Sequence, residues 1–149
     1  MYLVPLLVSL IVPLMLVSVQ QPSSAASIEA EVNKTGGALV YGITFGKGSA
    51  SLQSASDTVL QQIAVLMRDH TDWRFEVQGH TDGLGAAASN MRLSRQRADA
   101  VVEWLVRRGV QPERLVARGY GDTRPVSMQP TVEARLLNSR VQLRKLNEE

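Results

Sequence analysis

The chain of 149 residues contains no cysteine, and its first 28 residues contain no aspartate, glutamate, lysine or arginine. The missing cysteines exclude disulfide bonds, a thiol nucleophile, thiolate metal ligands and lipid attachment to a cysteine of this chain. The 16 basic and 14 acidic residues all lie between Glu29 and Glu149. A net charge of +2 is too balanced to indicate nucleic-acid binding, which normally needs a concentrated basic face. The sequence therefore divides into an apolar leader and about one domain of ordinary folded composition.

The leader is apolar from Tyr2 to Val19 and is interrupted by Pro5 and Pro13. The small residues Ser24-Ala25-Ala26 that follow fit the cleavage pattern of a secretory signal, with the cut after Ala26. No basic residue precedes the apolar run, and the run is slightly shorter than the roughly 20 residues that span a bilayer. We expect residues 1–26 to be either a signal peptide or an N-terminal membrane anchor, and both outcomes export the domain.

Strands are predicted by apolar and polar residues that alternate along the chain. Residues 27–37 are expected to form a short strand or linker, paired as a hairpin with a second strand over residues 38–45. Further alternating segments occupy residues 74–79, 115–117 and 141–146.

Helices are predicted where apolar residues recur at helical spacing. One is expected to be capped by Ser54 or Ser56 and to end near Asp69, and a longer one is expected to run from an Asn90 cap to Gly109. A short helix is expected over residues 131–137. The mixture predicts an α/β (α+β) two-layer sandwich over residues 38–149, with a mixed sheet of four to five strands and two main helices on one face.

Two segments carry residues suited to a binding site. Asp82 lies just after a predicted strand, at the start of a glycine-rich loop, where its side chain can either face a ligand or cap its own turn. On the following helix, Asn90, Ser94 and Arg97 share one stripe at the border of the buried face. Because an unpaired buried charge is costly, Arg97 needs an anionic partner.

Asp82 is the acidic residue that the preceding loop offers to Arg97. The two groups can pair with each other as a structural salt bridge. They can instead stand apart and hold a zwitterion, with the carboxylate on an ammonium group and the guanidinium on a carboxylate. The chemistry of the two side chains leaves both arrangements open.

The wider pattern resembles the OmpA-like C-terminal domain family over about 100 residues, from Tyr41 to Leu143. The residues that carry the resemblance are Gly79-His80-Thr81-Asp82, Gly85, Asn90, Leu93-Ser94, Arg97-Ala98, Val101, Gly109-Val110, Arg114-Leu115, Gly119-Tyr120-Gly121, Pro125-Val126, Arg135, Asn138 and Arg140-Val141. The resemblance implies a periplasmic domain that binds peptidoglycan non-covalently. Its implied ligand is the free end of diaminopimelate in the stem peptide, which is a zwitterion.

The resemblance also implies roles for single residues. Asp82 is similar to the family aspartate that meets the ammonium group, and Arg97 to the arginine that meets the carboxylate. Asn90 and the backbone from Thr81 to Gly83 are similar to the supporting residues, and Arg140 matches an arginine at the edge of the pocket. The chain departs from the family pattern at Gly46, Gln129, Ala134 and Ser139, where the family usually has Asp, Asn, Gly and Arg.

Other functions have less support. His70 and His80 lack the spacing of a zinc-binding histidine pair, no Gly-x-Ser-x-Gly motif is present, and alternation places Glu76 on the surface. We therefore expect no enzyme activity, no metal and no cofactor. The alternative is a docking or structural subunit of an envelope machine, such as a secretion system or a stator, with weak or no peptidoglycan binding. The expected location is the periplasm or outer membrane of a Gram-negative cell.

Overall fold

The computed structural model describes residues 21–147, so most of the predicted leader lies outside the described residues. Within them, no helix is both long and apolar enough to cross a bilayer. The helices and strands are α1 (Ala25–Thr35), β1 (Gly37–Val40), α2 (Asp57–Asp69), β2 (Phe75–Gly79), α3 (Ala87–Arg107), β3 (Leu115–Gly119), α4 (Val132–Asn138) and β4 (Val141–Lys145), with short 3-10 turns η1 (Ser54–Ser56) and η2 (Pro112–Arg114).

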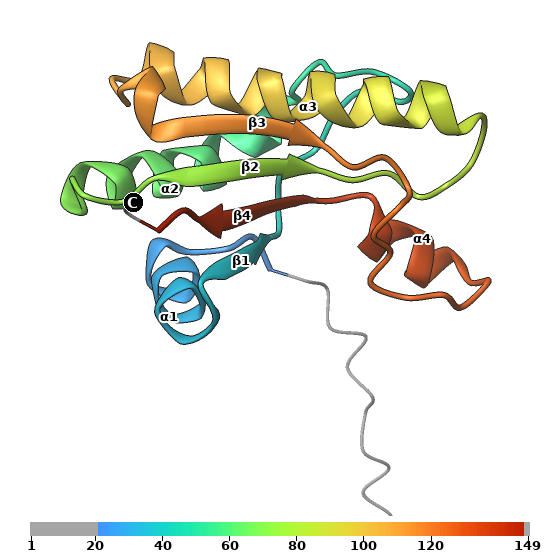
Figure 1. Cartoon of the computed structure of the whole chain (residues 1–149), viewed down its shortest axis with the longest axis horizontal. Helices are drawn as coiled ribbons and strands as arrows, with labels where there is room; N and C mark the ends of the chain where they lie inside the picture. Colours follow the sequence, from blue (N-terminus) through green and yellow to red (C-terminus); the bar gives the residue numbers. More distant parts are fainter. Residues whose placement is uncertain (1–20, 148–149) are drawn as a thin grey trace, which may run out of the picture.

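The four strands form one mixed sheet in the order β1-β4-β2-β3 (Figure 1). β2 and β3 run parallel, whereas β4 is antiparallel to both of its neighbours. In the middle of the sheet, Val77 lies opposite Leu143 on one side and Ala117 on the other. The predicted α/β fold with a mixed sheet is thereby confirmed.

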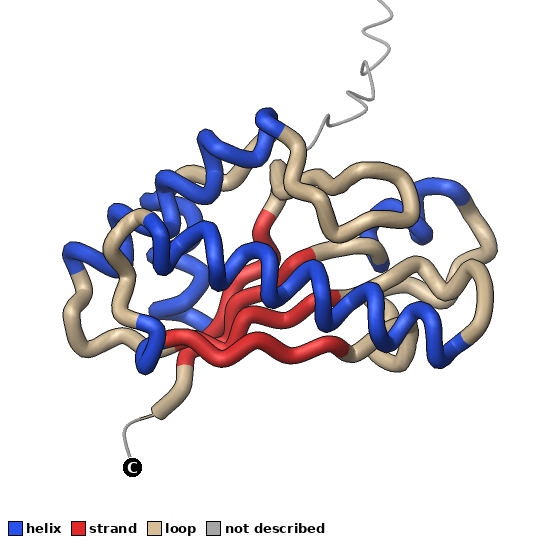
Figure 2. The backbone as a smooth tube through the Cα atoms, turned by 90° about the horizontal axis from the view of Figure 1, so that it is seen from above, coloured by secondary structure: helices blue, strands red, loops and turns tan. Residues whose placement is uncertain are grey.

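Helix α3 lies over the sheet and runs alongside β3 (Figure 1 and Figure 2). Gly79 and Gly119 make this approach possible, because a Cβ atom at either position would collide with the backbone of Ser94 or Arg95 on α3. The apolar face of α2 joins the same core, with Leu60, Ile63 and Met67 fully buried. The close packing fixes the start of α3 relative to the ends of β2 and β3.

The strand predicted near residues 27–37 is wrong, because this segment forms α1. Ser24 and Ser27 form a reciprocal capping box at its start, and Gly36 ends it with a φ of 81°. Ile28 and Val32 lie four residues apart, so one helix face buries both side chains. The predicted hairpin is also wrong, since β1 pairs with β4 from the far end of the chain.

The loop after β1 is tied to the start of α2 through a buried serine. Ser56 does not cap the helix with its side chain as predicted. Its Oγ accepts a hydrogen bond from the backbone N–H of Thr44 at 2.8 Å and donates one to the Thr44 carbonyl oxygen at 3.0 Å. This loop is therefore held against the start of α2 and can form a wall of a site.

The prediction that Glu76 is a surface charge is wrong. Its side chain does point to the sheet face opposite Val77, as alternation implies, but the residue is only 5% exposed. The carboxylate accepts hydrogen bonds from Tyr120 Oη at 2.6 Å, Gln78 Nε2 at 2.7 Å and an Arg144 guanidinium nitrogen at 3.0 Å. Burial raises the pKa of Glu76, but these hydrogen bonds outweigh it and the pKa is lowered.

Candidate functional site

The loop that follows β2 brings Asp82 to the end of the sheet. The backbone N–H of His80 donates to the Arg140 carbonyl oxygen at 3.0 Å, and that of Thr81 donates to the Gly121 carbonyl oxygen at 2.9 Å. Asp82 Oδ1 then accepts from the backbone N–H of Leu84 at 3.0 Å, which is the local turn that sequence reasoning considered. Within residues 21–147, Oδ1 is the only oxygen of the Asp82 carboxylate that accepts a hydrogen bond. The turn therefore leaves Oδ2 available to a ligand.

Asn90 lies within the first turns of α3 and does not cap the helix as predicted, because α3 begins at Ala87 after Ala86. It is 6% exposed. Its side-chain Nδ2 is buried and has no hydrogen-bond partner within residues 21–147. Thr81 lines the same cleft as Asn90, and its Oγ1 is likewise buried without a hydrogen-bond partner within residues 21–147.

Arg97 occupies the border position that its helical stripe predicts. Its Nε donates to the Ser49 carbonyl oxygen at 2.9 Å, and one terminal nitrogen lies 3.4 Å from Ser139 Oγ. The guanidinium carbon lies 4.9 Å from the centre of the Phe45 ring. Burial lowers the pKa of Arg97, and the negative charge of Asp82 partly opposes that effect. Within the part of the chain that the structure describes, these two charged groups form no ion pair with each other.

A cleft of about 530 Å³ joins these side chains. The residues that line it are Lys47, Gly48, Thr81, Asp82, Leu84, Asn90, Leu93, Arg97, Val132, Arg135, Leu136 and Ser139. Four of the six predicted site residues are therefore brought together: Thr81, Asp82, Asn90 and Arg97. Gly83 is exposed and does not line the cleft.

Arg140 lies in an adjoining hollow of about 300 Å³, which shares Arg97 and Ser139 with the main cleft. Its guanidinium donates to the carbonyl oxygens of Asn138 and Arg124 and to the side chain of Gln142. Most of its donors are thereby engaged in holding the loops around the site. The structure places Arg140 beside the cleft as a support for its wall.

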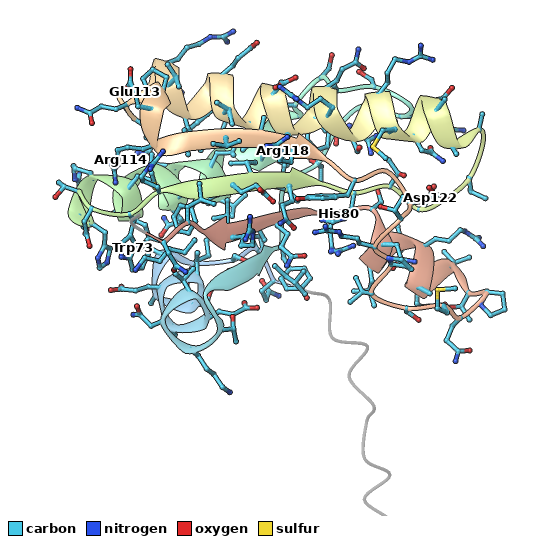
Figure 3. The ribbon with its side chains drawn as sticks, in the orientation of Figure 1. Trp73, His80, Glu113, Arg114, Arg118 and Asp122 are labelled. Carbon is cyan, nitrogen blue, oxygen red and sulfur yellow. The ribbon has the colours of Figure 1, made fainter. Side chains whose placement is uncertain are left out.

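His80 lies beneath the same loops, at the end of the sheet next to α4 (Figure 3). The residue is 2% exposed, and its ring stacks on Tyr120 with centroids 5.4 Å apart. Burial, helped by the positive charges of Arg140 and Arg124, lowers the pKa of His80 to about 4. The imidazole is therefore neutral at physiological pH and packs as part of the wall.

Sequence reasoning missed Lys47, Val132 and Leu136 as cleft residues. Lys47 lies in an irregular loop, and Val132 and Leu136 lie in a short helix. None of the three belongs to a periodic pattern long enough to predict that it lines the site. Arg135, which belongs to the family pattern, also lines the cleft. The cleft is lined by three basic side chains and by the carboxylate of Asp82, so it suits a ligand that carries an anionic group and an ammonium group. No cluster of three potential metal ligands occurs within residues 21–147.

Comparisons with known proteins find relatives of this chain. The model of the OmpA family matches residues 44–139. The probable lipoprotein YiaD of Escherichia coli is 35% identical over 101 residues, which cover 68% of this chain and 46% of that protein. The peptidoglycan-binding protein ArfA of Mycobacterium tuberculosis is 34% identical over 119 residues, which cover 79% of this chain and 35% of that protein. The matched region spans less than half of either relative.

Solved structures share the fold. The peptidoglycan-associated lipoprotein of Burkholderia pseudomallei superimposes with a TM-score of 0.65 and 29% identity, covering 70% of this chain and 88% of that one. The periplasmic domain of Helicobacter pylori MotB superimposes with a TM-score of 0.66 at 21% identity, covering 76% of this chain and 81% of that one, and supports the fold alone.

Proposed function

Because this chain belongs to the OmpA family, we propose that it binds peptidoglycan without forming a covalent bond and so anchors an envelope protein or complex to the cell wall. Two of its relatives, a peptidoglycan-binding protein and a peptidoglycan-associated lipoprotein, support this assignment. The same relatives support a place in the cell envelope. For residues 1–26 the proposal remains a signal peptide or a membrane anchor.

The ligand in this proposal is the free end of diaminopimelate in the stem peptide. Asp82 accepts hydrogen bonds from its ammonium group, and the terminal nitrogens of Arg97 donate to its carboxylate. The Ser49 carbonyl holds Arg97 at Nε, on one edge of the guanidinium, and so orients the rest of the fork. A charge that is already positioned loses less side-chain freedom when the ligand binds.

The observation that carries the proposal is a cleft in which a carboxylate and a guanidinium group are both present without forming an ion pair. Asp82 and Arg97 line it without an ion pair, and Asn90 Nδ2 and Thr81 Oγ1 are buried beside them without partners in residues 21–147. Buried polar groups without hydrogen bonds destabilise a fold. A polar ligand supplies the missing partners, which gives these four side chains a common purpose.

A sedimentation assay tests the proposal. The full chain should pellet with purified sacculi that contain diaminopimelate, and Asp82→Ala or Arg97→Ala should each weaken binding by about 2–5 kcal/mol, the effect of leaving one desolvated charge without its partner. Arg95→Gln is the matched control, because Arg95 is exposed on the same helix and pairs with Asp99. Wild-type binding by both cleft variants would contradict the clamp, and release of soluble muropeptides would reveal catalysis instead.

A further inference from the structure

The exposed large hydrophobic side chains gather at one end of the molecule. Within the described residues they are Leu84, Met91, Val126, Met128, Val132, Leu136 and Leu137. Five of them belong to α4 and the loop before it. Met128 is 85% exposed and Leu136 is 70% exposed. Isolated apolar residues on a surface need no explanation, but several that gather at one end indicate an interaction surface.

We name the side chains of Leu84, Val126, Met128, Val132 and Leu136 the apolar tip. These residues belong to α4, to the loop before it and to the loop after β2, which lie together at one end of the sheet (Figure 1). Three of its members, Leu84, Val132 and Leu136, also line the cleft. Whatever covers the apolar tip therefore also borders the entrance of the binding site.

The chain enters the domain at this same end. Val40 at the end of β1 lies opposite Val141, and Gly79 at the end of β2 also lies opposite Val141. The backbone N–H of Ser23 donates to the carbonyl oxygen of Tyr41, the residue after β1, at 2.9 Å. The described chain, which the apolar run of residues 2–19 precedes in the sequence, is thus held at the end of the sheet where β1 and β2 end.

Positive charge accompanies the apolar tip. Arg124 is exposed, with its guanidinium carbon 3.8 Å from the centre of the Tyr120 ring, and Lys47 and Arg135 border the cleft. The cations here outnumber the acidic residues. Lys47, Arg97, Arg124, Arg135 and Arg140 stand against Asp82, Asp122 and Glu133. Protruding apolar side chains among arginine and lysine residues are the combination that binds the interface of an anionic membrane.

We propose that the apolar tip docks on the surface of a bilayer that contains anionic lipid. A lipid surface fits better than a second protein, because basic side chains accompany the exposed apolar ones and because the described chain, which an apolar run precedes in the sequence, is held at Tyr41 at the same end of the sheet. Since the tip borders the cleft, a docked domain has its binding site turned toward the lipid. Membrane docking and binding of the cell wall therefore exclude each other.

The absence of cysteine allows a direct test on the full chain. A fluorophore on Met128→Cys reports on the tip, and one on Arg107→Cys is the matched control, because Arg107 is exposed near the opposite end of α3. Both proteins are mixed with phosphatidylethanolamine vesicles that contain phosphatidylglycerol and a nitroxide-labelled lipid. The Met128 label should be quenched several-fold more strongly than the Arg107 label, whereas attachment through residues 2–19 alone would give equal quenching of both and overturn the proposal.

Two further comparisons separate other occupants. Leu136→Ser in the Met128→Cys protein should reduce the quenching several-fold, whereas Gln96→Ser on the exposed side of α3 should not. Replacing the anionic vesicles by phosphatidylcholine should weaken quenching as well. Self-association of the tip would overturn the proposal. It would change the fluorescence of the Met128 label without vesicles, in a way that depends on protein concentration, and would give energy transfer between two labelled copies. None of these readouts depends on peptidoglycan binding.

Discussion

Asp82 and Arg97 line the same cleft from a loop and from the helix that follows it, yet within the described residues they do not pair. Each has a different local partner: Asp82 holds the backbone of Leu84, and Arg97 holds that of Ser49. These contacts keep the two charges in place and leave donors and acceptors for a third molecule. The relationship favours the clamp over the structural salt bridge that the sequence left open.

Asn90 gives a prediction with two opposite readouts. Asn90→Leu keeps the approximate volume but removes the unpartnered Nδ2. Binding of a diaminopimelate-containing muropeptide should weaken by about 1–3 kcal/mol, whereas the free energy of unfolding should stay the same or rise, because an unsatisfied buried polar group is lost. Calorimetric titration and urea unfolding measure the two quantities. A fall in stability with unchanged binding would show that Asn90 is only structural.

The close contact between sheet and helix predicts the effect of a single methyl group. Gly79→Ala should destabilise the fold by at least about 1–3 kcal/mol, because the new Cβ would meet the carbonyl group of Ser94 on α3. Gly46→Ala is the control, since its Cβ would lie 3.5 Å from Ser49 in ordinary contact. Thermal unfolding of both variants checks this, and equal melting temperatures would contradict the described packing.

His80 should make stability depend on pH. Its folded-state pKa of about 4 lies below the ordinary value of 6.5, so the folded protein favours the neutral ring. This contribution, about 3 kcal/mol, is fully present above pH 6.5 and is lost as pH falls through 4. Urea unfolding between pH 3.5 and about 7 should show that slope, and His80→Gln should flatten it. An NMR titration that places the His80 ring near pH 6.5 would refute the expectation.

The start of α1 bears on the proposed leader. A cut after Ala26 would leave Ile28 and Val32 in the core but remove Ser24, which caps the helix. A chain that begins at Ser27 should therefore be less stable than one that begins at Gln21, by about 1 kcal/mol. Urea unfolding of the two forms measures the difference. Mass spectrometry of the mature protein then shows which N-terminus the cell produces.

The sequence predicted the regular parts of this fold because their signals extend over many residues. Apolar positions at helical spacing located α2 and α3, and alternation located β2 and β4. The stretch from Ile28 to Val32 was wrongly predicted as a strand. Its apolar residues alternate over only five positions, and the same spacing places Ile28 and Val32 on one face of a helix. Only the serines that cap the start of α1 and Gly36, which ends it, could have indicated this helix.

The part of the site around Arg97 could be predicted, because a partly buried arginine has few roles other than binding an anion. A border arginine needs an anion, which directed attention from Arg97 to Asp82. Glu76 was misjudged because alternation specifies a face of the sheet and not what covers it. Its cover comes from Tyr120 and Arg144, which the sheet brings from distant parts of the sequence. Lys47 and Leu136 reach the cleft by the same kind of long-range folding.

The most direct test of the clamp is calorimetric titration of the full chain with the tripeptide L-Ala-γ-D-Glu-meso-diaminopimelate and with the same peptide amidated at the free carboxylate of its side-chain end. The wild-type chain should bind the unmodified peptide and lose most of that affinity on amidation, because Arg97 loses its anion. Arg97→Gln should bind both peptides equally weakly. Equal affinity of the wild-type chain for the two peptides, unchanged in Arg97→Gln, would contradict the clamp.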